Sequence, residues 1–441
     1  MKLMKTVLVA TGGIWLQVYA AQVDVETCSD WETAVEATLA EDTTANLLNR
    51  VDSFFGQNCG NGTFKSFEVK NNKLTVVAPA IFDSDGPRFW DIRFEVTDGG
   101  AMNFTTSVDF RFTTRDENDL EVNGGFFHVG EGSAARFMKN LEVSDYGTTS
   151  VTESGFDFTS DIWDGGCLWN NGSFIVDGVA TFDACFNIGG GESLPGRGGA
   201  IFNDVNAYIA FDGGVNIKDT ALTEDSGNSG AGVYNLGEID VKGDSIFQDL
   251  PSSDGESGGG IFNGEGATFQ FKNEAVAAFI DTVAGYGGGV YNAGTFSFSG
   301  PAIFIKSSGS AIYNASPGIM KLSEGSVFFA NVGSYGGAVR NEYGAELYIA
   351  DDISFLNNFA WVRAILWGTR ATPETPLRYV FMRMQKLGRK PAEERKTNGM
   401  PADSIGIKFS KGFDVLCTAA TCFVLCIRRR YKVGIRHYVV C

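Results

Sequence analysis

The chain has very little histidine and no cysteine pair at the spacing that binds zinc. Only His128 and His437 occur among its 441 residues, and none of the 8 cysteines forms a C-x-x-C pair. Structural zinc sites use Cys and His at short spacings, and histidine is a common general base near neutral pH. The sequence therefore argues against a zinc-stabilised fold and against chemistry that depends on a histidine base or a histidine metal cage.

Basic residues are scarce over the first 360 residues. Residues 361–441 hold 16 of the 35 Lys+Arg and 5 of the 53 Asp+Glu, a net charge of +11. Residues 1–360 therefore hold 19 Lys+Arg and 48 Asp+Glu, a net charge of −29. An acidic body repels the phosphates of nucleic acid, and it repels anionic glycans unless a cation bridges them. The change of sign marks a boundary near Ala360.

Helical periodicity is absent from the middle of the chain, where a glycine-rich repeat takes its place. The chain has 56 Gly and 36 Phe. A hexapeptide recurs that usually consists of two glycines, a small residue, a branched apolar residue, an aromatic residue and Asn. Its copies start at Gly165, Gly198, Gly230, Gly258, Gly287, Gly309 and Gly336. The Asn residues of adjacent copies are 22 to 33 residues apart, and a degenerate copy, Gly124–His128, precedes them.

A repeat period of roughly 20 to 50 residues indicates a solenoid or a propeller. Each repeat here contains one recurring turn and short alternating runs such as Thr268–Phe271, whereas a propeller blade needs four strands. The sequence therefore predicts an all-β fold, a right-handed parallel β-helix of about eight coils over residues 121–360. Residues 21–120 are expected to form a small N-terminal cap with a short helix from Ser29 to about Ala40, because the open end of a solenoid exposes apolar core.

The asparagine that ends each repeat has a structural interpretation. Asn tolerates a left-handed turn and bonds to neighbouring backbone, so one Asn per coil predicts a hydrogen-bonded ladder. A role in ligand binding is the alternative. The expected ladder consists of Asn170, Asn203, Asn235, Asn263, Asn292, Asn314 and Asn341.

A second motif, F-x-x-N, occurs at Phe328–Asn331 and Phe355–Asn358, with degenerate forms at Phe279–Thr282, Phe304–Ser307 and Leu222–Asp225. Together, the G-G-A-[ILV] and F-x-x-N motifs resemble the repeats of the chlamydial polymorphic outer-membrane proteins, over residues 120–360. The resemblance implies a right-handed β-helix that is displayed at a cell surface as an adhesin-like passenger.

The N-terminus is typical of a secretory signal peptide, with Lys2 and Lys5 before an apolar stretch and a cleavage site after Ala20. Residues 1–20 are therefore expected to direct a secreted or cell-surface glycoprotein. Four N-x-[ST] sequons are candidate glycosylation sites: Asn61, Asn103, Asn171 and Asn314.

Four cysteines of the acidic body are disulfide candidates in an exported protein. They are Cys28, Cys59, Cys167 and Cys185. Proximity in the sequence favours the pairs Cys28–Cys59 and Cys167–Cys185, although three pairings are open.

A weak calcium site is predicted from three aspartates. Asp225, Asp254 and Asp281 precede the Asn of their coil by 10, 9 and 11 residues, so they could stack on successive coils. A solvated acidic turn is the alternative interpretation. No other cofactor is expected.

The basic tail, residues 361–441, contains the run Phe413–Ile427, which is apolar except for Asp414 and which Arg428–Arg430 follows. This pattern is typical of a membrane anchor with a cytosolic basic stop, but the run is shorter than the roughly 20 residues that a spanning helix needs. A disordered tail and a wrongly assigned end of the gene are the alternatives.

These features favour a secreted or cell-surface module that acts as an adhesin or structural protein without catalysis. Its expected partners are extracellular glycans or surface proteins and not nucleic acid; a membrane is a partner only if the tail is an anchor. The alternative is a carbohydrate-active enzyme, a polysaccharide lyase, hydrolase or epimerase on a pectate-lyase-like β-helix. Such an enzyme would need carboxylates and a basic residue in one groove.

Overall fold

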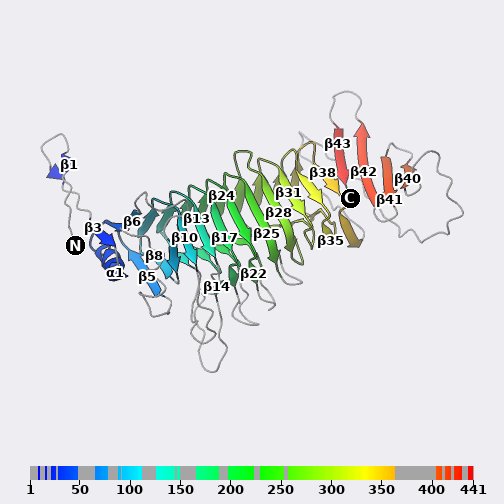
Figure 1. The fold of residues 1–441 in the computed structure, drawn as a ribbon. Coiled ribbons are helices and arrows are strands. Elements are labelled where there is room, and N and C mark those ends of the chain that lie inside the picture. The colour runs from blue at the N-terminus through cyan, green and yellow to red at the C-terminus, as the bar shows by residue number, and fades with distance from the viewer. Residues whose placement is uncertain are drawn as a thin grey trace, which may run out of the picture.

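The computed structural model is a rod of stacked, parallel β-strands (Figure 1). It describes residues 21–25, 28–47, 65–77, 88–90, 92–111, 126–144, 147–148, 165–187, 197–222, 229–252 and 257–362, with short strands at 8–9, 15–16, 404–409, 413–418, 422–429 and 436–440. Three long sheets run the length of the rod, and every strand in them pairs in parallel with the strand one coil away. The predicted parallel β-helix is confirmed.

The three sheets are numbered here in the order in which each coil visits them. Sheet I has ten strands: β5 (Lys65–Lys70), β8 (Ile92–Thr97), β11 (Phe127–Val129), β15 (Leu168–Asn170), β19 (Ile201–Asn203), β23 (Val233–Asn235), β26 (Ile261–Asn263), β29 (Val290–Asn292), β32 (Ile312–Asn314) and β36 (Val339–Asn341). Sheet II has twelve: β3 (Ala21–Val25), β4 (Thr43–Leu47), β6 (Lys73–Val77), β9 (Ala101–Phe104), β12 (Ala134–Phe137), β16 (Ser173–Val176), β20 (Tyr208–Phe211), β24 (Glu238–Val241), β27 (Thr268–Phe271), β30 (Thr295–Phe298), β33 (Ile319–Leu322) and β37 (Glu346–Ile349). Sheet III has ten: β7 (Arg88–Trp90), β10 (Val108–Arg111), β13 (Leu141–Ser144), β17 (Ala180–Asp183), β21 (Val215–Lys218), β25 (Ser245–Pro251), β28 (Ala277–Val283), β31 (Ala302–Ile305), β34 (Val327–Phe329) and β38 (Ser354–Leu356).

The coils begin earlier than the glycine repeat indicates. Sheets I and III have ten strands each, so the rod has ten complete coils, and the first two, β5–β7 and β8–β10, lie within the residues assigned to the cap. These early coils have valine at the position of the later asparagine, because Val129 pairs with both Val96 and Asn170. These coils therefore lack the glycine repeat and its Asn, although their strands follow the same order through sheets I, II and III.

The N-terminal end is closed by the helix α1 (Cys28–Ala37), as expected of a solenoid cap. Trp31 is fully buried, and its ring lies 5.8–6.3 Å from those of Phe67, Phe89 and Phe94. The helix begins one residue before Ser29, so Ser29 lies in the first turn and not at the predicted N-cap position.

In-register pairing stacks like residues through the core. The inward phenylalanines of sheet III pack face to face, with ring centroids 4.6–4.9 Å apart and interplanar angles of 6–9°. This stack consists of Phe247, Phe279, Phe304, Phe328 and Phe355. Offset and stacked aromatic pairs add to the stabilisation that burial alone provides.

The asparagine ladder forms as predicted. Each Nδ2 donates to the Oδ1 of the next coil over 2.7–2.8 Å, from Asn170 through to Asn341. The side chains are 0–4% exposed, and several also donate to carbonyls of the adjacent coil, as Asn263 does to Thr295. Because a buried amide must be hydrogen-bonded, the ladder fixes the register of one coil on the next.

The first glycine of each repeat turns the chain into sheet I at a positive φ, for example 73° at Gly198. A Cβ at Gly198 would lie 2.2 Å from the carbonyl oxygen of Ile201. No other residue fits this corner without moving the backbone.

The F-x-x-N motif builds a second, shorter ladder after sheet III. The Nδ2 of Asn331 donates to the Oδ1 of Asn358 over 2.8 Å, and the backbone N–H of Ser307 donates to the Oδ1 of Asn331 over 2.8 Å. The hydroxyls of Thr282 and Ser307, which come from the degenerate copies, lie 2.9 Å apart.

The remaining strands form small sheets. They are β1 (Leu8–Val9) with β2 (Trp15–Leu16), β14 (Gly147–Thr148) with β18 (Phe186–Asn187) and β22 (Ala221–Leu222), β35 (Val332–Tyr335) with β39 (Phe359–Val362), and the antiparallel set β40 (Ser404–Phe409), β41 (Phe413–Thr418), β42 (Cys422–Arg429) and β43 (Arg436–Val440). Within the part of the chain that the structure describes, no helix is both long and apolar enough to span a membrane. The signal peptide and the nature of the tail stay predictions.

Replacing Asn263 with leucine should interrupt the first ladder in the middle of the rod. The change removes the acceptor of Asn235 and the donor to Asn292. We expect a loss of about 2–4 kcal/mol in the free energy of unfolding, because buried polar groups lose partners. Gln270→Leu, on the outer face of the same coil, is the control and should change it by less than about 0.5 kcal/mol. Urea unfolding measures both, and equal effects would contradict a role of the ladder in stability.

Candidate functional site

The outer face of sheet I carries one row of side chains, the residues that immediately precede the ladder positions. From the N-terminal end the row is Glu68, Glu95, His128, Trp169, Phe202, Tyr234, Phe262, Tyr291, Tyr313 and Arg340. From Phe202 to Tyr313, neighbouring rings are 4.3–5.7 Å apart at interplanar angles of 3–21°. The ring faces therefore cover one another, and the row leaves mainly ring edges for a ligand.

The N-terminal end of this row is polar, and charged side chains surround His128 there. Glu68, Glu95 and His128 lie on three successive coils. The Nε of Arg93, which is 7% exposed, lies 3.4 Å from the Oε1 of Glu95. The Nζ of Lys70 lies 2.7 Å from the Oε1 of Glu68. Two carboxylates, an imidazole and a buried guanidinium on one face are groups that can carry acid–base chemistry.

The sequence contains a signal for this cluster that the repeat analysis missed. The tripeptide F-E-V occurs at Phe67–Val69 and again at Phe94–Val96, 27 residues later, and F-H-V follows at Phe127–Val129. These copies mark the same coil position at the period of the glycine repeat. The two F-E-V copies lie within the residues expected to form the cap, because no glycine pair precedes them.

The environment of the cluster shifts two pKa values. Burial, together with the charge of Arg93, lowers the pKa of His128 to about 4, and the imidazole stacks on the ring of Trp169 at 4.1 Å and 5°. Burial acts to raise the pKa of Glu68, but hydrogen bonds from Lys70 and Thr97 outweigh it and lower that pKa. His128 is therefore neutral near pH 7 while Glu68 is ionised.

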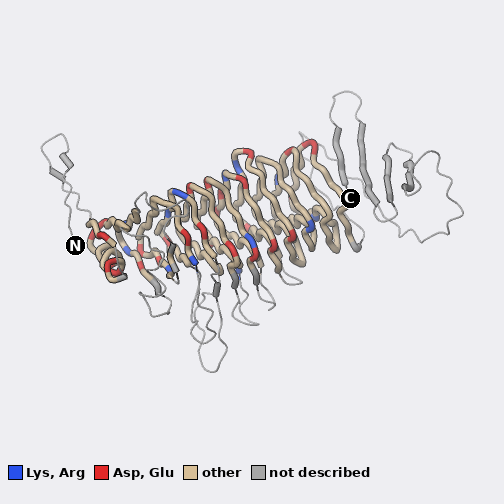
Figure 2. Tube along the Cα trace, viewed as in Figure 1, with Lys and Arg blue, Asp and Glu red and all other residues tan. Residues whose placement is uncertain are grey.

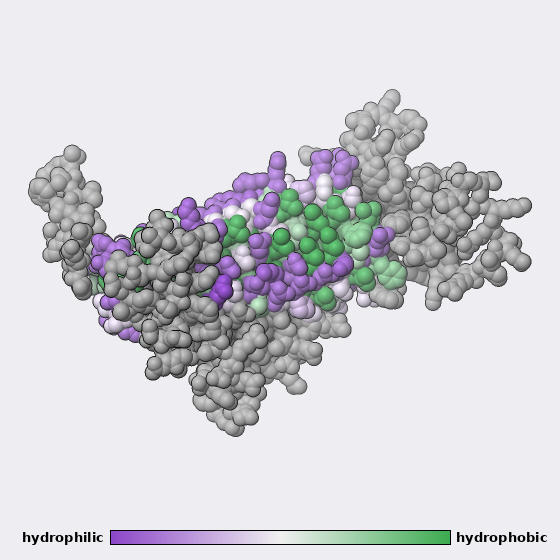
Figure 3. All heavy atoms as spheres, in the orientation of Figure 1, coloured by the Kyte–Doolittle hydropathy of each residue, from purple (hydrophilic) through white to green (hydrophobic). Residues whose placement is uncertain are grey.

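The outer face of sheet III is divided along the rod. Its N-terminal half is charged: the Nε of Arg111 lies 2.9 Å from the Oδ2 of Asp109, and the Nζ of Lys218 lies 2.6 Å from the Oδ2 of Asp183. Its C-terminal half, from β25 onward, is mainly aliphatic, with Gln248, Phe329 and Ser354 as the exceptions. Figure 3 shows this half as a green area on the face toward the viewer.

We call the aliphatic half the sheet III stripe. Two rows on β25, β28, β31 and β34 form it: Ile246, Ala278, Ile303 and Val327 in one, and Ile280, Ile305 and Phe329 in the other. Ile246 and Phe329 are 43% and 39% exposed, and the others are half-buried. Single exposed apolar residues are ordinary, but a contiguous apolar patch marks an interaction site.

Of the three aspartates of the predicted calcium site, Asp281 lies among the described residues. Asp281 lies in register with Asp249, because Leu250 pairs with Thr282, and Asp219 occupies the same corner one coil earlier. Asp225 and Asp254 lie outside the described residues. All three corner aspartates have positive φ, 51–53°. The Nζ of Lys306 lies 3.4 Å from the Oδ2 of Asp281. The register aligns Asp281 with Asp249, and calcium binding stays a prediction.

Acidic side chains of the rod pair with bases one coil away. Lys242 and Asp212 are 2.8 Å apart, and Lys272 and Asp240 are 2.7 Å apart. Figure 2 shows how the charges of both signs follow the edges of the coils. Among the residues that the structure describes, no three His, Cys, Asp or Glu side chains are placed to hold a metal ion.

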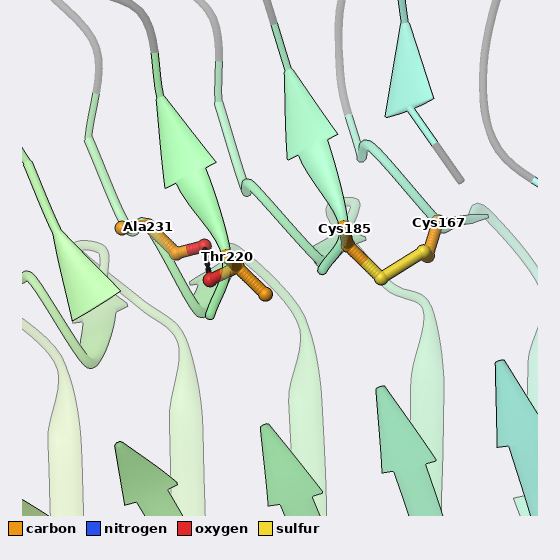
Figure 4. Close-up of a disulfide and its surroundings, with 4 residues drawn as sticks. All are labelled: Cys167, Cys185, Thr220 and Ala231. Carbon is orange, nitrogen blue, oxygen red and sulfur yellow. Dashed lines mark hydrogen bonds between the residues drawn. A yellow bond between two sulfur atoms is a disulfide. The ribbon is translucent and has the colours of Figure 1, made fainter. Parts of the chain in front are cut away.

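The cysteines at the centre of the rod form the disulfide Cys167–Cys185, the pair that proximity favoured. It joins the start and the end of the coil β15–β17. In the next coil Thr220 takes the position of Cys185, and its hydroxyl donates to the carbonyl of Ala231 over 2.8 Å (Figure 4). The side chains of Cys28 and Cys59 lie outside the described residues, so their pairing stays a prediction.

One predicted glycosylation site is wrong. Asn314 is fully buried in the ladder, where its Nδ2 donates to Asn341, so a glycan there is incompatible with the fold. Asn103 and Asn171 are half-buried at the surface and stay predictions. Asn61 lies outside the described residues.

No family model matches the chain, and neither a curated protein nor a solved structure matches it. The contacts within this chain are therefore the support for the fold and for the candidate binding surfaces.

The low pKa of His128 should make the protein sensitive to mild acid. The unfolded imidazole protonates near pH 6.5 while the folded one stays neutral to about pH 4, so stability is lost as the pH falls through this window. Between pH 7 and pH 5 the loss from this group should be about 2 kcal/mol. Urea unfolding of wild type and His128→Gln at both pH values isolates it. An identical pH dependence in the two proteins would show that His128 is not the titrating group.

Proposed function

We propose that the chain is a secreted or cell-surface binding module without catalytic activity, which attaches to other proteins through the sheet III stripe. The contiguous stripe carries this proposal, because exposed aliphatic side chains on a rigid sheet favour association with an apolar surface. The signal peptide pattern supports the location. The resemblance to the polymorphic outer-membrane protein repeats supports an adhesin-like role.

A protein is a better partner for this stripe than a glycan. Ile303, Ile305 and Val327 offer neither hydrogen-bonding groups nor ring faces, whereas sugar recognition needs precisely placed polar groups. Protein interfaces have an apolar centre with a polar rim, and Lys306 and Asp281 lie beside the stripe as such a rim.

The double variant Ile303→Asp/Ile305→Asp tests the stripe. Labelled full-length protein is titrated onto extracellular surface material of the source organism, before and after protease or glycosidase treatment. We expect saturable binding that protease treatment abolishes. The variant should weaken this binding at least tenfold, because removing water from the two new carboxylates costs free energy.

The matched control is Thr295→Asp/Ser297→Asp on β30, two outward positions of sheet II in the same coil. It should bind like wild type. Equal binding by both variants, or binding that only glycosidase abolishes, would overturn the proposal.

A carbohydrate-active enzyme is the second candidate, and the cluster around His128 favours it. Glu68 and Glu95 are on adjacent coils, and adjacent strands lie about 4.8 Å apart. Retaining glycosidases use two carboxyl groups at about 5 Å, one as acid and one as nucleophile. Arg93 and neutral His128 would position a polar substrate beside them.

Incubation of the full chain with neutral and acidic polysaccharides, with and without calcium, separates the two candidates. Mass spectrometry of the released material should show no oligosaccharide if the chain is a binding module. Products that disappear in Glu95→Gln but persist in Glu265→Gln, an exposed turn position of the mid-rod, would establish the enzyme instead.

A further inference from the structure

The two ends of the rod are finished differently. At the N-terminal end, α1 covers the first coils and Trp31 is fully buried. At the C-terminal end, β36, β37 and β38 are the last strands of the three sheets among the described residues. Such strands present unpaired backbone groups, which proteins usually cover or pair.

Exposed apolar side chains gather at the C-terminal end. Five of the twelve exposed large hydrophobic residues in the described part of the chain lie within residues 335–356. They surround the last coil, with Tyr348 on the outer face of sheet II and Leu356 on that of sheet III. We call these five the end patch: Tyr335, Tyr343, Tyr348, Ile349 and Leu356. The core also opens there, because Phe355 is only partly buried whereas Phe328, one coil earlier, is fully buried. Exposed apolar side chains beside unpaired strands favour a partner that covers them.

The charge of this end is negative. Residues 319–362 hold five acidic residues and two basic ones, a net charge of −3, and Asp351 and Asp352 are exposed. One of the bases, Arg340, is paired with Glu342 at 3.0 Å. Two copies of this end would repel each other, and the body of each copy carries a net charge of −29 over residues 1–360.

We propose that residues 363–441 of the same chain dock on the end patch and close the C-terminal end of the rod. This segment has 16 basic and 5 acidic residues, a net charge of +11, and it contains the apolar run Phe413–Ile427. It leaves the rod after Val362, at the end of β39, beside the patch. Tethering at this point gives the segment a high effective concentration there. The proposal is independent of the partner of the sheet III stripe.

A specific protease site inserted between Val362 and Arg363 of the full chain tests the docking. The protein is folded intact and then cut. We expect the released segment to co-elute with the rod in size-exclusion chromatography at low salt and to separate at about 1 M salt, where charges are screened. Hydrogen exchange in β37 and β38 should become faster on separation.

Asp351→Lys/Asp352→Lys should weaken retention of the cut segment at least tenfold. Glu265→Lys/Glu274→Lys, which makes the same charge change at exposed turns of the middle coils, should leave it unchanged. Separation at low salt, or equal weakening in both variants, would overturn the proposal. So would protection of β37 and β38 that depends on protein concentration and persists without the segment, since a second copy would then be the cover.

Discussion

The structure depends on the in-register pairing of each coil with the next, and the buried asparagine ladder enforces that register. A slip of one residue would send every inward side chain to the outer face of its sheet. It would also leave the amides of residues such as Asn235 and Asn263 without partners in an apolar interior. Because the first cost applies to every coil and the second to every coil from Asn170 onward, one arrangement is strongly favoured. Stacked phenylalanines and stacked glycine corners then follow at fixed positions.

The same register explains which predictions from the sequence succeeded. The repeat Asn, the positive-φ glycine and the F-x-x-N motif are tied to the strands themselves, so counting along the sequence located them. The aspartates of the predicted calcium site were counted back from the Asn, across a corner whose length varies from coil to coil. Counted forward from the stacked core residues Ile217, Phe247 and Phe279, the aligned aspartates are Asp219, Asp249 and Asp281.

The missed cluster has a different cause. The first coils use Val69, Val96 and Val129 where later coils use Asn, so an apolar residue fills the site and no polar signature remains. Arg93 is buried only once neighbouring coils pack around it, and the amino-acid composition does not show this packing. The outward F-E-V residues are recognisable only once their period is compared with that of the glycine repeat. Pattern alone therefore located the core better than the surface.

Register also decides what the surface can do, because every outward position becomes a row along the rod. A row of one charge sign would repel itself, and in the pairs Asp212–Lys242 and Asp240–Lys272 a lysine of one coil neutralises an aspartate of the coil before it. In the row of aromatic rings on sheet I, each ring covers the face of its neighbour, so mainly ring edges are left for a ligand. A row of aliphatic side chains, by contrast, remains available for binding along its whole length. Sheet III combines such rows with a charged half that begins at Asp109 and Arg111. Under the proposed function, a partner that lies along this face would meet charge at one end and apolar area at the other, so that the polar half would set its orientation while the apolar half supplied the affinity.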